Sequence, residues 1–205
     1  MIPDFDLNAP GVFLGFHMSQ NRRAIPAWSY LLEKVRPVST IVEIGTNIGG
    51  FSCLLALGAL NIGATFDTLD VCKFNEDTLQ LFEFLCARKG GFHQLDAFSN
   101  EGQSLVKSRL SRDGRAILLC DGGNKGKEFS TFVPQLKQGD IIGVHDARGR
   151  ESWPWQEFHP KLFRDFAAEH NLWPFMDEVF LETGWFVCVK MPTNTEGVRE
   201  EAAWS

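Results

Sequence analysis

The stretch Thr40-Ile-Val-Glu-Ile-Gly-Thr-Asn-Ile-Gly-Gly-Phe51 decides the fold of this 205-residue chain. β-Branched and apolar residues at 40–44 predict a buried strand, and the apolar run at 50–60 predicts a helix. Residues 45–49 between them predict a tight turn, because glycine adopts backbone conformations closed to other residues and lets a ligand approach closely. This order of elements is typical of the place where an open α/β sheet seats a nucleotide-like cofactor.

The spacing of the glycines narrows the choice of cofactor. The chain has Gly45-x-x-x-Gly49-Gly50, which differs from the G-x-G-x-x-G of dinucleotide-binding domains. Glu43 stands two residues before the first glycine, where a carboxylate repels a pyrophosphate. It can orient the turn and attract a cofactor that carries an ammonium or sulfonium group. A generic strand-to-helix turn with incidental glycines is the alternative interpretation.

Composition argues against several classes of protein. No apolar run approaches the roughly 18 residues that span a bilayer, and the first residues lack the features of a signal peptide. The net charge is −6 and the 20 Lys and Arg residues are scattered, which argues against a nucleic-acid partner. The five cysteines show no C-x-x-C spacing, and Cys120 and Cys188 fall in predicted strands as small apolar residues. We therefore expect a cytoplasmic protein.

Three segments divide the chain. We expect an N-terminal arm over residues 1–25, one domain over 26–191 and a polar tail over 192–205. Prolines and glycines predict irregular structure in the arm, although it carries several aromatic residues. The arm serves as a lid over a pocket, as a contact in a homo-oligomer or as an extension packed on the surface, and the sequence leaves these alternatives open.

Strands and helices alternate through the domain. After a first helix that begins at Pro26, we expect strands at 40–44, 65–70, 92–95, 116–120 and 141–144, and helices at 50–60, 75–88, 102–110 and 125–133. A helix at 160–170 precedes two strands, 175–181 and 185–190, joined by the short turn 182–184. The pattern predicts an α/β, Rossmann-like, doubly wound sheet that is mostly parallel and ends in an antiparallel hairpin.

Glu43-x-Gly45-Thr46-x-x-Gly49-Gly50 resembles motif I of the class I S-adenosylmethionine-dependent methyltransferases, and with the order of elements the resemblance covers about residues 26–191. A sheet of this class has seven strands, and its terminal hairpin places the seventh strand between the fifth and the sixth. The resemblance implies S-adenosylmethionine as cofactor. It also implies cofactor contacts from Glu43, Gly45, Thr46, Asn47, Gly49 and Gly50.

Acids after the second and third strands extend the predicted cofactor site. Asp70 ends the second strand, where an acid hydrogen-bonds the two ribose hydroxyls, and the resemblance gives Asp70 that role. Glu76 is a weaker rival. The family places an acid near the adenine amino group after the third strand, which corresponds to Asp96, with Ala97 beside the ring. A helix N-cap explains Asp96 equally well.

A second group of polar residues follows the fourth and fifth strands. Asp121, which also borders the predicted cofactor, would share one rim of the sheet with His145 and Asp146. Such ligands suit a divalent cation that holds a substrate's oxygens and lowers the pKa of a hydroxyl. Asp121 and Asp146 match positions from which metal-dependent O-methyltransferases hold Mg²⁺. The chain looks closest to the rhamnosyl O-methyltransferase and cephalosporin hydroxylase group.

The sequence departs from that group after the fourth strand. It has Asp121-Gly-Gly-Asn-Lys125, where those relatives often show two acids and a histidine. Without a metal, His145 paired with Asp146 or Asp121 would act as general base. Lys125 would act as a base only with a lowered pKa, and otherwise would neutralise a developing alkoxide. The aromatic loop Trp153–His159 either walls an acceptor pocket or caps the core.

These observations favour a methyltransferase that acts on an oxygen of a small-molecule or sugar-like acceptor, with divalent-metal assistance left open. An NAD-dependent oxidoreductase is a second hypothesis, although its glycine spacing is missing. A non-catalytic cofactor-binding module is a third. No membrane or nucleic-acid partner is expected.

Overall fold

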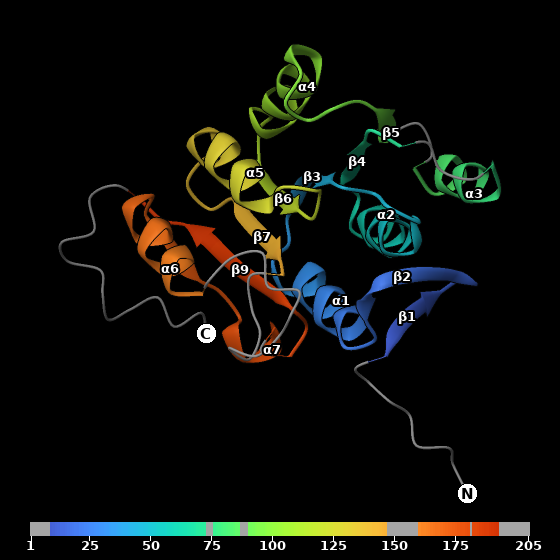
Figure 1. The fold of residues 1–205 in the computed structure, drawn as a ribbon, viewed down its shortest axis with the longest axis horizontal. Helices are drawn as coiled ribbons and strands as arrows, with labels where there is room; N and C mark the ends of the chain where they lie inside the picture. The colour runs from blue at the N-terminus through green and yellow to red at the C-terminus, as the bar shows by residue number, and fades with distance from the viewer. Residues whose placement is uncertain (1–8, 73–75, 87–89, 147–159, 181, 193–205) are drawn as a thin grey trace, which may run out of the picture.

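A seven-stranded sheet forms the centre of the computed structural model, which describes residues 9–72, 76–86, 90–146, 160–180 and 182–192 (Figure 1). Its strand order is β5-β4-β3-β6-β7-β9-β8. The strands are β3 (Val38–Ile44), β4 (Thr65–Asp70), β5 (Gly90–Gln94), β6 (Arg115–Cys120), β7 (Ile141–His145), β8 (Leu172–Pro174) and β9 (Trp185–Lys190). The first five run parallel, whereas β9 is antiparallel to both β7 and β8. The predicted α/β sheet with its inserted seventh strand is therefore confirmed.

Helices cover both faces of the sheet. They are α1 (Ala24–Lys34), α2 (Gly50–Ile62), α3 (Glu76–Cys86), α4 (Asn100–Leu110), α5 (Lys125–Phe132) with the 3-10 turn η1 (Val133–Gln135), α6 (Pro160–Glu169) and the short α7 (Asp177–Phe180). Alternate strand residues enter different cores: Ile41 packs with α1 to α3, and its neighbour Val42 packs with α4 to α6. Strands β6 and β7 are mostly apolar because both of their faces are buried.

The predicted irregular N-terminal arm is wrong for residues 10–21, which form the antiparallel strands β1 (Pro10–Phe13) and β2 (Phe16–Asn21). The two loop residues, Leu14 and Gly15, have φ angles of 50° and 86°. Positive φ at both positions is typical of the type I′ hairpin turn. The turn lacks the Asn-Gly signature, so the sequence pattern indicates only that Gly15 interrupts regular secondary structure.

Three other predicted elements are corrected. Helix α1 begins at Ala24, and Pro26 lies in its first turn, where no backbone donor is needed. The predicted strand at 175–181 is wrong, since the strand is β8 and α7 occupies most of that stretch. Met176 has a φ of 52°, which ends the extended conformation. The third strand also begins two residues earlier than expected, at Gly90.

An aromatic cluster ties α1 to the sheet beneath its functional rim. Trp28 of α1 has its ring centroid 6.0 Å from Phe51, 5.1 Å from Phe180 and 5.0 Å from Trp185. A Cβ at Gly143 of β7 would lie 2.9 Å from the Trp28 ring, so the indole packs directly on the strand. The cluster therefore fixes the start of α2 relative to β7 and β9.

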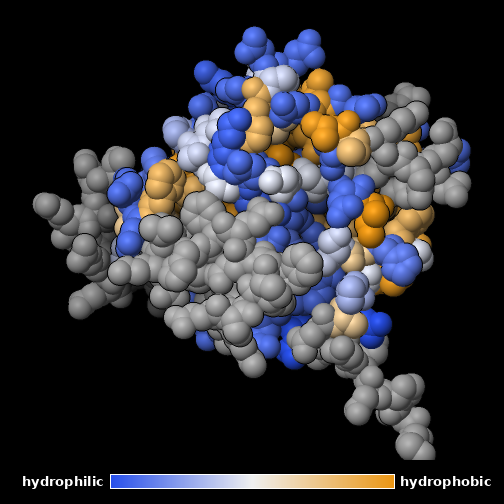
Figure 2. Space-filling view, in the orientation of Figure 1, coloured by the Kyte–Doolittle hydropathy of each residue, from blue (hydrophilic) through white to orange (hydrophobic). Residues whose placement is uncertain are grey.

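Hydrophilic side chains cover much of the viewed surface of the described residues, and hydrophobic ones gather on the side of α2 and β5 (Figure 2). None of the described helices is long and apolar enough to cross a membrane. Exposed apolar side chains include Leu57 and Leu60 of α2 and Phe84 of α3.

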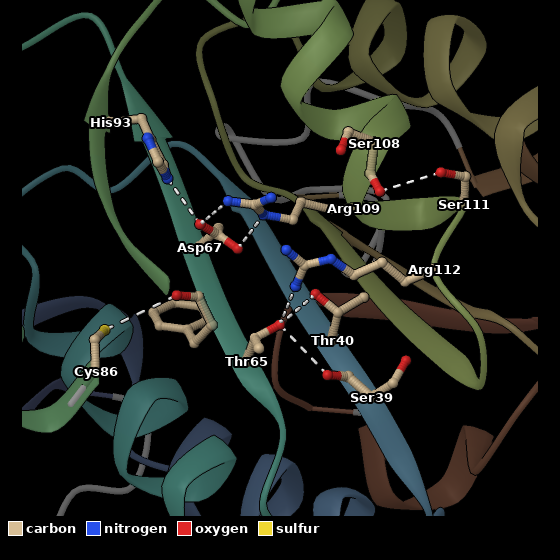
Figure 3. A network of polar contacts seen from close by, with 11 residues as sticks. Ser39, Thr40, Thr65, Asp67, Cys86, His93, Ser108, Arg109, Ser111 and Arg112 are labelled. Carbon is tan, nitrogen blue, oxygen red and sulfur yellow. Dashed lines mark hydrogen bonds and ion pairs between the residues drawn. The ribbon is translucent and has the colours of Figure 1, made fainter. Parts of the chain in front are cut away.

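A buried polar network fastens the β5 edge of the sheet (Figure 3). Asp67 of β4 is fully buried and accepts from Arg109 Nε at 2.6 Å and from His93 Nε2 at 2.7 Å. Burial by itself would raise the pKa of Asp67, but the bonds and charges of His93 and Arg109 outweigh it and hold the pKa below its ordinary value. The Asp67 carboxylate of β4 therefore links this strand to α4 through Arg109 and to β5 through His93.

We expect Arg109→Met to lower the free energy of unfolding by about 3–5 kcal/mol, because it leaves a buried carboxylate without its main partner. Denaturant unfolding at neutral pH measures this loss. Arg112→Met is the matched control, since Arg112 makes one bond to Thr65 at 3.1 Å in an exposed position, and it should cost under about 1 kcal/mol. Equal effects of the two substitutions would contradict the network's role.

Candidate cofactor and catalytic site

The glycine turn between β3 and α2 is shaped by close packing of the backbone. Gly45 has a φ of 91°, and a Cβ there would lie 2.3 Å from the carbonyl oxygen of Asp121. A Cβ at Gly50 would lie 2.2 Å from the carbonyl oxygen of His17 in β2. Only glycine fits at either position. The motif therefore lets β6 and the N-terminal hairpin approach the turn.

Glu43 lies beneath this turn, almost fully buried. Its carboxyl oxygen accepts from Ser52 Oγ at 2.5 Å and Thr68 Oγ1 at 2.7 Å. Burial, opposed by these two bonds and assisted by the charges of Asp121 and Asp70, raises the pKa of Glu43 to about 8. The sequence analysis missed both hydroxyl partners, since an isolated serine or threonine carries no pattern.

Asp70 contacts the same turn from the end of β4. Its Oδ2 accepts from the backbone N–H groups of Thr46 at 2.8 Å and Asn47 at 2.9 Å. Carboxylate oxygens have further lone pairs, so Asp70 can still accept from hydroxyl groups of a ligand. Two exposed apolar side chains, Ile48 and Val71, lie beside these residues in the sequence. The side chain of Glu76 lies outside the described residues.

Asp96 and Ala97 occupy different environments. Asp96 is exposed, and its Oδ1 accepts from the Phe98 backbone N–H at 2.8 Å. Helix α4 is capped by Ser99, whose hydroxyl accepts from Gly102 N at 3.0 Å. Ala97 is buried in the core with α4. Asp96 thus remains available at the rim, whereas the Ala97 side chain faces the core.

Asp121 and His145 meet at the carboxyl ends of β6 and β7. His145 Nδ1 lies 2.8 Å from Asp121 Oδ1, and the other oxygen of Asp121 accepts from Gln20 Nε2 of β2. Both side chains are largely buried, and the ring centroid of Trp185 lies 4.9 Å from that of the imidazole. Burial lowers the pKa of His145, but the charge and hydrogen bond of Asp121 outweigh it and raise that pKa above its ordinary value. The arrangement leaves Nε2 of His145 without a hydrogen-bond partner among the described residues.

A lysine stands beside this pair. Lys125 Nζ lies 3.2 Å from Asp146 Oδ2 and donates to the Gly122 carbonyl at 2.9 Å. The buried Glu128 accepts from the Gly122 and Asn124 backbone N–H groups and so shapes the loop after β6. Burial, partly offset by these bonds, raises the pKa of Glu128 to about 7. The sequence analysis identified Lys125 and missed Glu128, which is one helical turn further along.

The predicted metal ligands do not form a fitting donor set. Asp121 already uses both carboxylate oxygens, and Asp146 is paired with the Lys125 ammonium. A divalent cation at this place would be repelled by the lysine. Within the described ranges, no three His, Cys, Asp or Glu side chains are grouped closely enough to hold a metal ion.

Comparisons with solved structures agree with this fold. No family model and no curated protein matches the sequence. Solved structures do match, among them a protein from Staphylococcus aureus assigned as a caffeoyl-CoA O-methyltransferase, at 14% identity and a TM-score of 0.55 over 83% of this chain and 84% of that chain. A methyltransferase from Geobacter sulfurreducens matches at 11% identity and a TM-score of 0.56, over 84% and 80% of the two chains.

The O-methyltransferase TomG from Streptomyces achromogenes, which is involved in tomaymycin synthesis, was solved in complex with S-adenosylmethionine. It matches at 16% identity and a TM-score of 0.54, over 81% of this chain and 79% of that chain. This chain has the class I methyltransferase fold. In the methyltransferase fold of this chain, the glycine turn, Asp70, Asp121 and His145 all lie at the carboxyl edge of the sheet.

The buried Glu43 predicts a pH dependence of stability. Its folded pKa of about 8 lies above the ordinary value of 4.5, so the folded state holds a proton that the unfolded state has released. Stability from this group is present below about pH 4.5 and is lost as pH rises toward 8. We expect Glu43→Gln to flatten the decline in unfolding free energy between pH 5 and 8.

Denaturant titrations across this pH range measure the effect. The matched control is Glu101→Gln, which changes a solvent-exposed glutamate of α4 and should leave the slope of wild type. If Glu43→Gln left the slope of unfolding free energy against pH unchanged, the Glu43 carboxyl would already be ionised in the folded protein.

Proposed function

We propose that this protein is an S-adenosylmethionine-dependent methyltransferase that methylates a hydroxyl oxygen of a small-molecule or sugar-like acceptor. The observation that carries the proposal is the Asp121–His145 pair, 2.8 Å apart, at the rim that also holds the glycine turn. An oriented imidazole beside a cofactor turn suits the removal of a hydroxyl proton. The oxygen chemistry named for two of the matched proteins supports the choice of acceptor.

The residues at the turn suit the proposed cofactor. Asp121, whose backbone packs against Gly45, places a carboxylate near the turn, which favours a ligand with positive charge. The two oxygens of Asp70 have spare lone pairs for ribose hydroxyls, and the exposed Ile48 and Val71 offer apolar surface to a base. When bound, the cofactor supplies an electrophilic methyl group. The glycine spacing and the antiparallel β9 do not suit an NAD-dependent oxidoreductase.

His145 is the proposed general base. Its Nδ1–H donates to Asp121, which fixes the tautomer and leaves Nε2 as the basic nitrogen. Nε2 would take the proton of the acceptor hydroxyl and so leave its oxygen nucleophilic toward the methyl group that the bound cofactor would supply. The Asp121 carboxylate then stabilises the imidazolium that forms, in the manner of other histidine–aspartate pairs.

Lys125 has the role of a fixed positive charge. Its ion pair with Asp146 favours the ammonium form, so it is better suited to stabilise a developing alkoxide than to accept a proton. This charge occupies the place that the sequence analysis gave to a divalent cation. We infer that transfer to the acceptor proceeds without a metal. The aromatic loop at 153–159, the predicted wall of an acceptor pocket, lies outside the described residues.

The five cysteines are free, and all but Cys72 are buried. Unpaired cysteines suit a reducing compartment, which supports the cytoplasmic location that we propose for the protein.

Calorimetric titration with S-adenosylmethionine tests the cofactor. We expect wild type to bind with micromolar affinity, about −8 kcal/mol, and Asp70→Ala to bind at least about 10-fold more weakly because the ribose and the turn lose an acceptor. Asp113→Ala, which removes an exposed aspartate after α4, is the control and should bind like wild type. Wild-type protein that binds no S-adenosylmethionine would refute the proposal, and NAD would be the next ligand to titrate.

Transfer of labelled methyl groups to a panel of catechols and sugars tests the base. We expect His145→Gln to lower kcat by about 10²–10⁴-fold with little change in cofactor affinity. Because the pKa of His145 is raised, the wild-type rate should increase with pH as the imidazole loses its proton. Asp121→Asn should move this rise to lower pH, since the carboxylate charge that raises the pKa is gone. Undiminished transfer by His145→Gln would exclude the imidazole as base.

A further inference from the structure

The N-terminal strand β2 forms one wall of the cofactor rim. Its His17 carbonyl packs against Gly50, and Ser19 Oγ accepts from Asn47 Nδ2 at 2.6 Å. A small cavity lies between Met18, Ser19 and Gln20 on one side and the glycine turn with Glu43 on the other. Its volume is about 10 Å³, enough for one water molecule or one ammonium group.

Gln20 is the polar residue of β2 that is buried at this cavity, with 5% of its surface exposed. Its Nε2 donates to Asp121 Oδ2. Because an ionised carboxylate only accepts, this bond decides which end of the amide faces Asp121. The other end, Oε1, is a buried acceptor without a hydrogen-bond partner among the described residues.

A buried carbonyl oxygen without a hydrogen-bond donor costs free energy. Because this oxygen lies beside a predicted ligand site, it points to a hydrogen-bond donor on the ligand. The surroundings specify the kind of donor. The Asp121 carboxylate contacts Gln20, and the carboxyl group of Glu43, which is protonated at neutral pH, lines the cavity. A cationic N–H donor satisfies the Gln20 carbonyl and is also attracted by the charge of Asp121, whereas a neutral hydroxyl only satisfies the carbonyl.

We propose that Gln20 binds the α-ammonium group of S-adenosylmethionine through Oε1 while it holds Asp121 through Nε2. The inference rests on the proposed function and adds to it a residue from outside the methyltransferase motif. One amide then links the amino-acid end of the cofactor to the Asp121–His145 pair. The base is oriented fully only when the hairpin is in place.

The test compares two ligands that differ by one group. S-adenosylhomocysteine carries the α-ammonium, and S-adenosyl-4-thiobutyrate lacks only that group. We expect wild type to bind the first about 10–100-fold more tightly, as for a buried hydrogen bond to a charged group. In Gln20→Met, which keeps the length of the side chain without hydrogen bonds, this preference should fall to within about twofold.

The matched control is His17→Ala, which alters an exposed side chain of the same strand and should keep the wild-type preference. A preference that survives in Gln20→Met would overturn the inference, and so would a wild type that binds both ligands equally. If Gln20→Met weakened the binding of both ligands by the same factor and left the preference intact, Gln20 would have a structural role only. Wild type that binds neither ligand would instead refute the proposed function.

Discussion

Contact between the ends of β3 and β6 is the constraint on which the rest of the site depends. Asp121 N donates to the Ile44 carbonyl at 2.9 Å, and the Gly45 N–H donates to the Leu69 carbonyl of β4 at 2.8 Å. These bonds align the carboxyl ends of β3, β4 and β6. They also place the backbone of Gly45 in direct contact with the backbone of Asp121. A side chain at position 45 would separate the strands and move the glycine turn away from Asp121.

Charges at this rim are arranged in pairs. Asp121 faces the imidazole of His145, and Asp146 pairs with the ammonium of Lys125, so each of these two carboxylates has a basic side chain beside it. Glu43 is the exception, because hydroxyl groups surround its carboxyl, and burial raises its pKa instead. The rim therefore combines a proton acceptor, a fixed cation and a neutral acid within a small volume, which suits a reaction that moves one proton and one positive charge.

The sequence was sufficient for the sheet because its signals are local and repeated. The apolar strand at 40–44, the glycine turn and the strand-end acids follow from residue type and period, and the sheet appears as expected. The prediction failed at the Leu14-Gly15 turn and at Met176, where non-glycine residues adopt positive φ. Nor could it find Gln20, Ser52 or Glu128, since each acquires its role from a partner that folding brings near.

The bond between Gln20 and Asp121 joins residues 101 positions apart. Closing so long a loop is entropically costly, and it becomes favourable only after the intervening strands have assembled. A ribosome delivers β2 early, yet the strand finds its partners in the turn and on β6 only after those segments have emerged. We therefore expect the wall of the rim to be completed late in folding, so that chains that have not finished their sheet lack the Gln20–Asp121 contact.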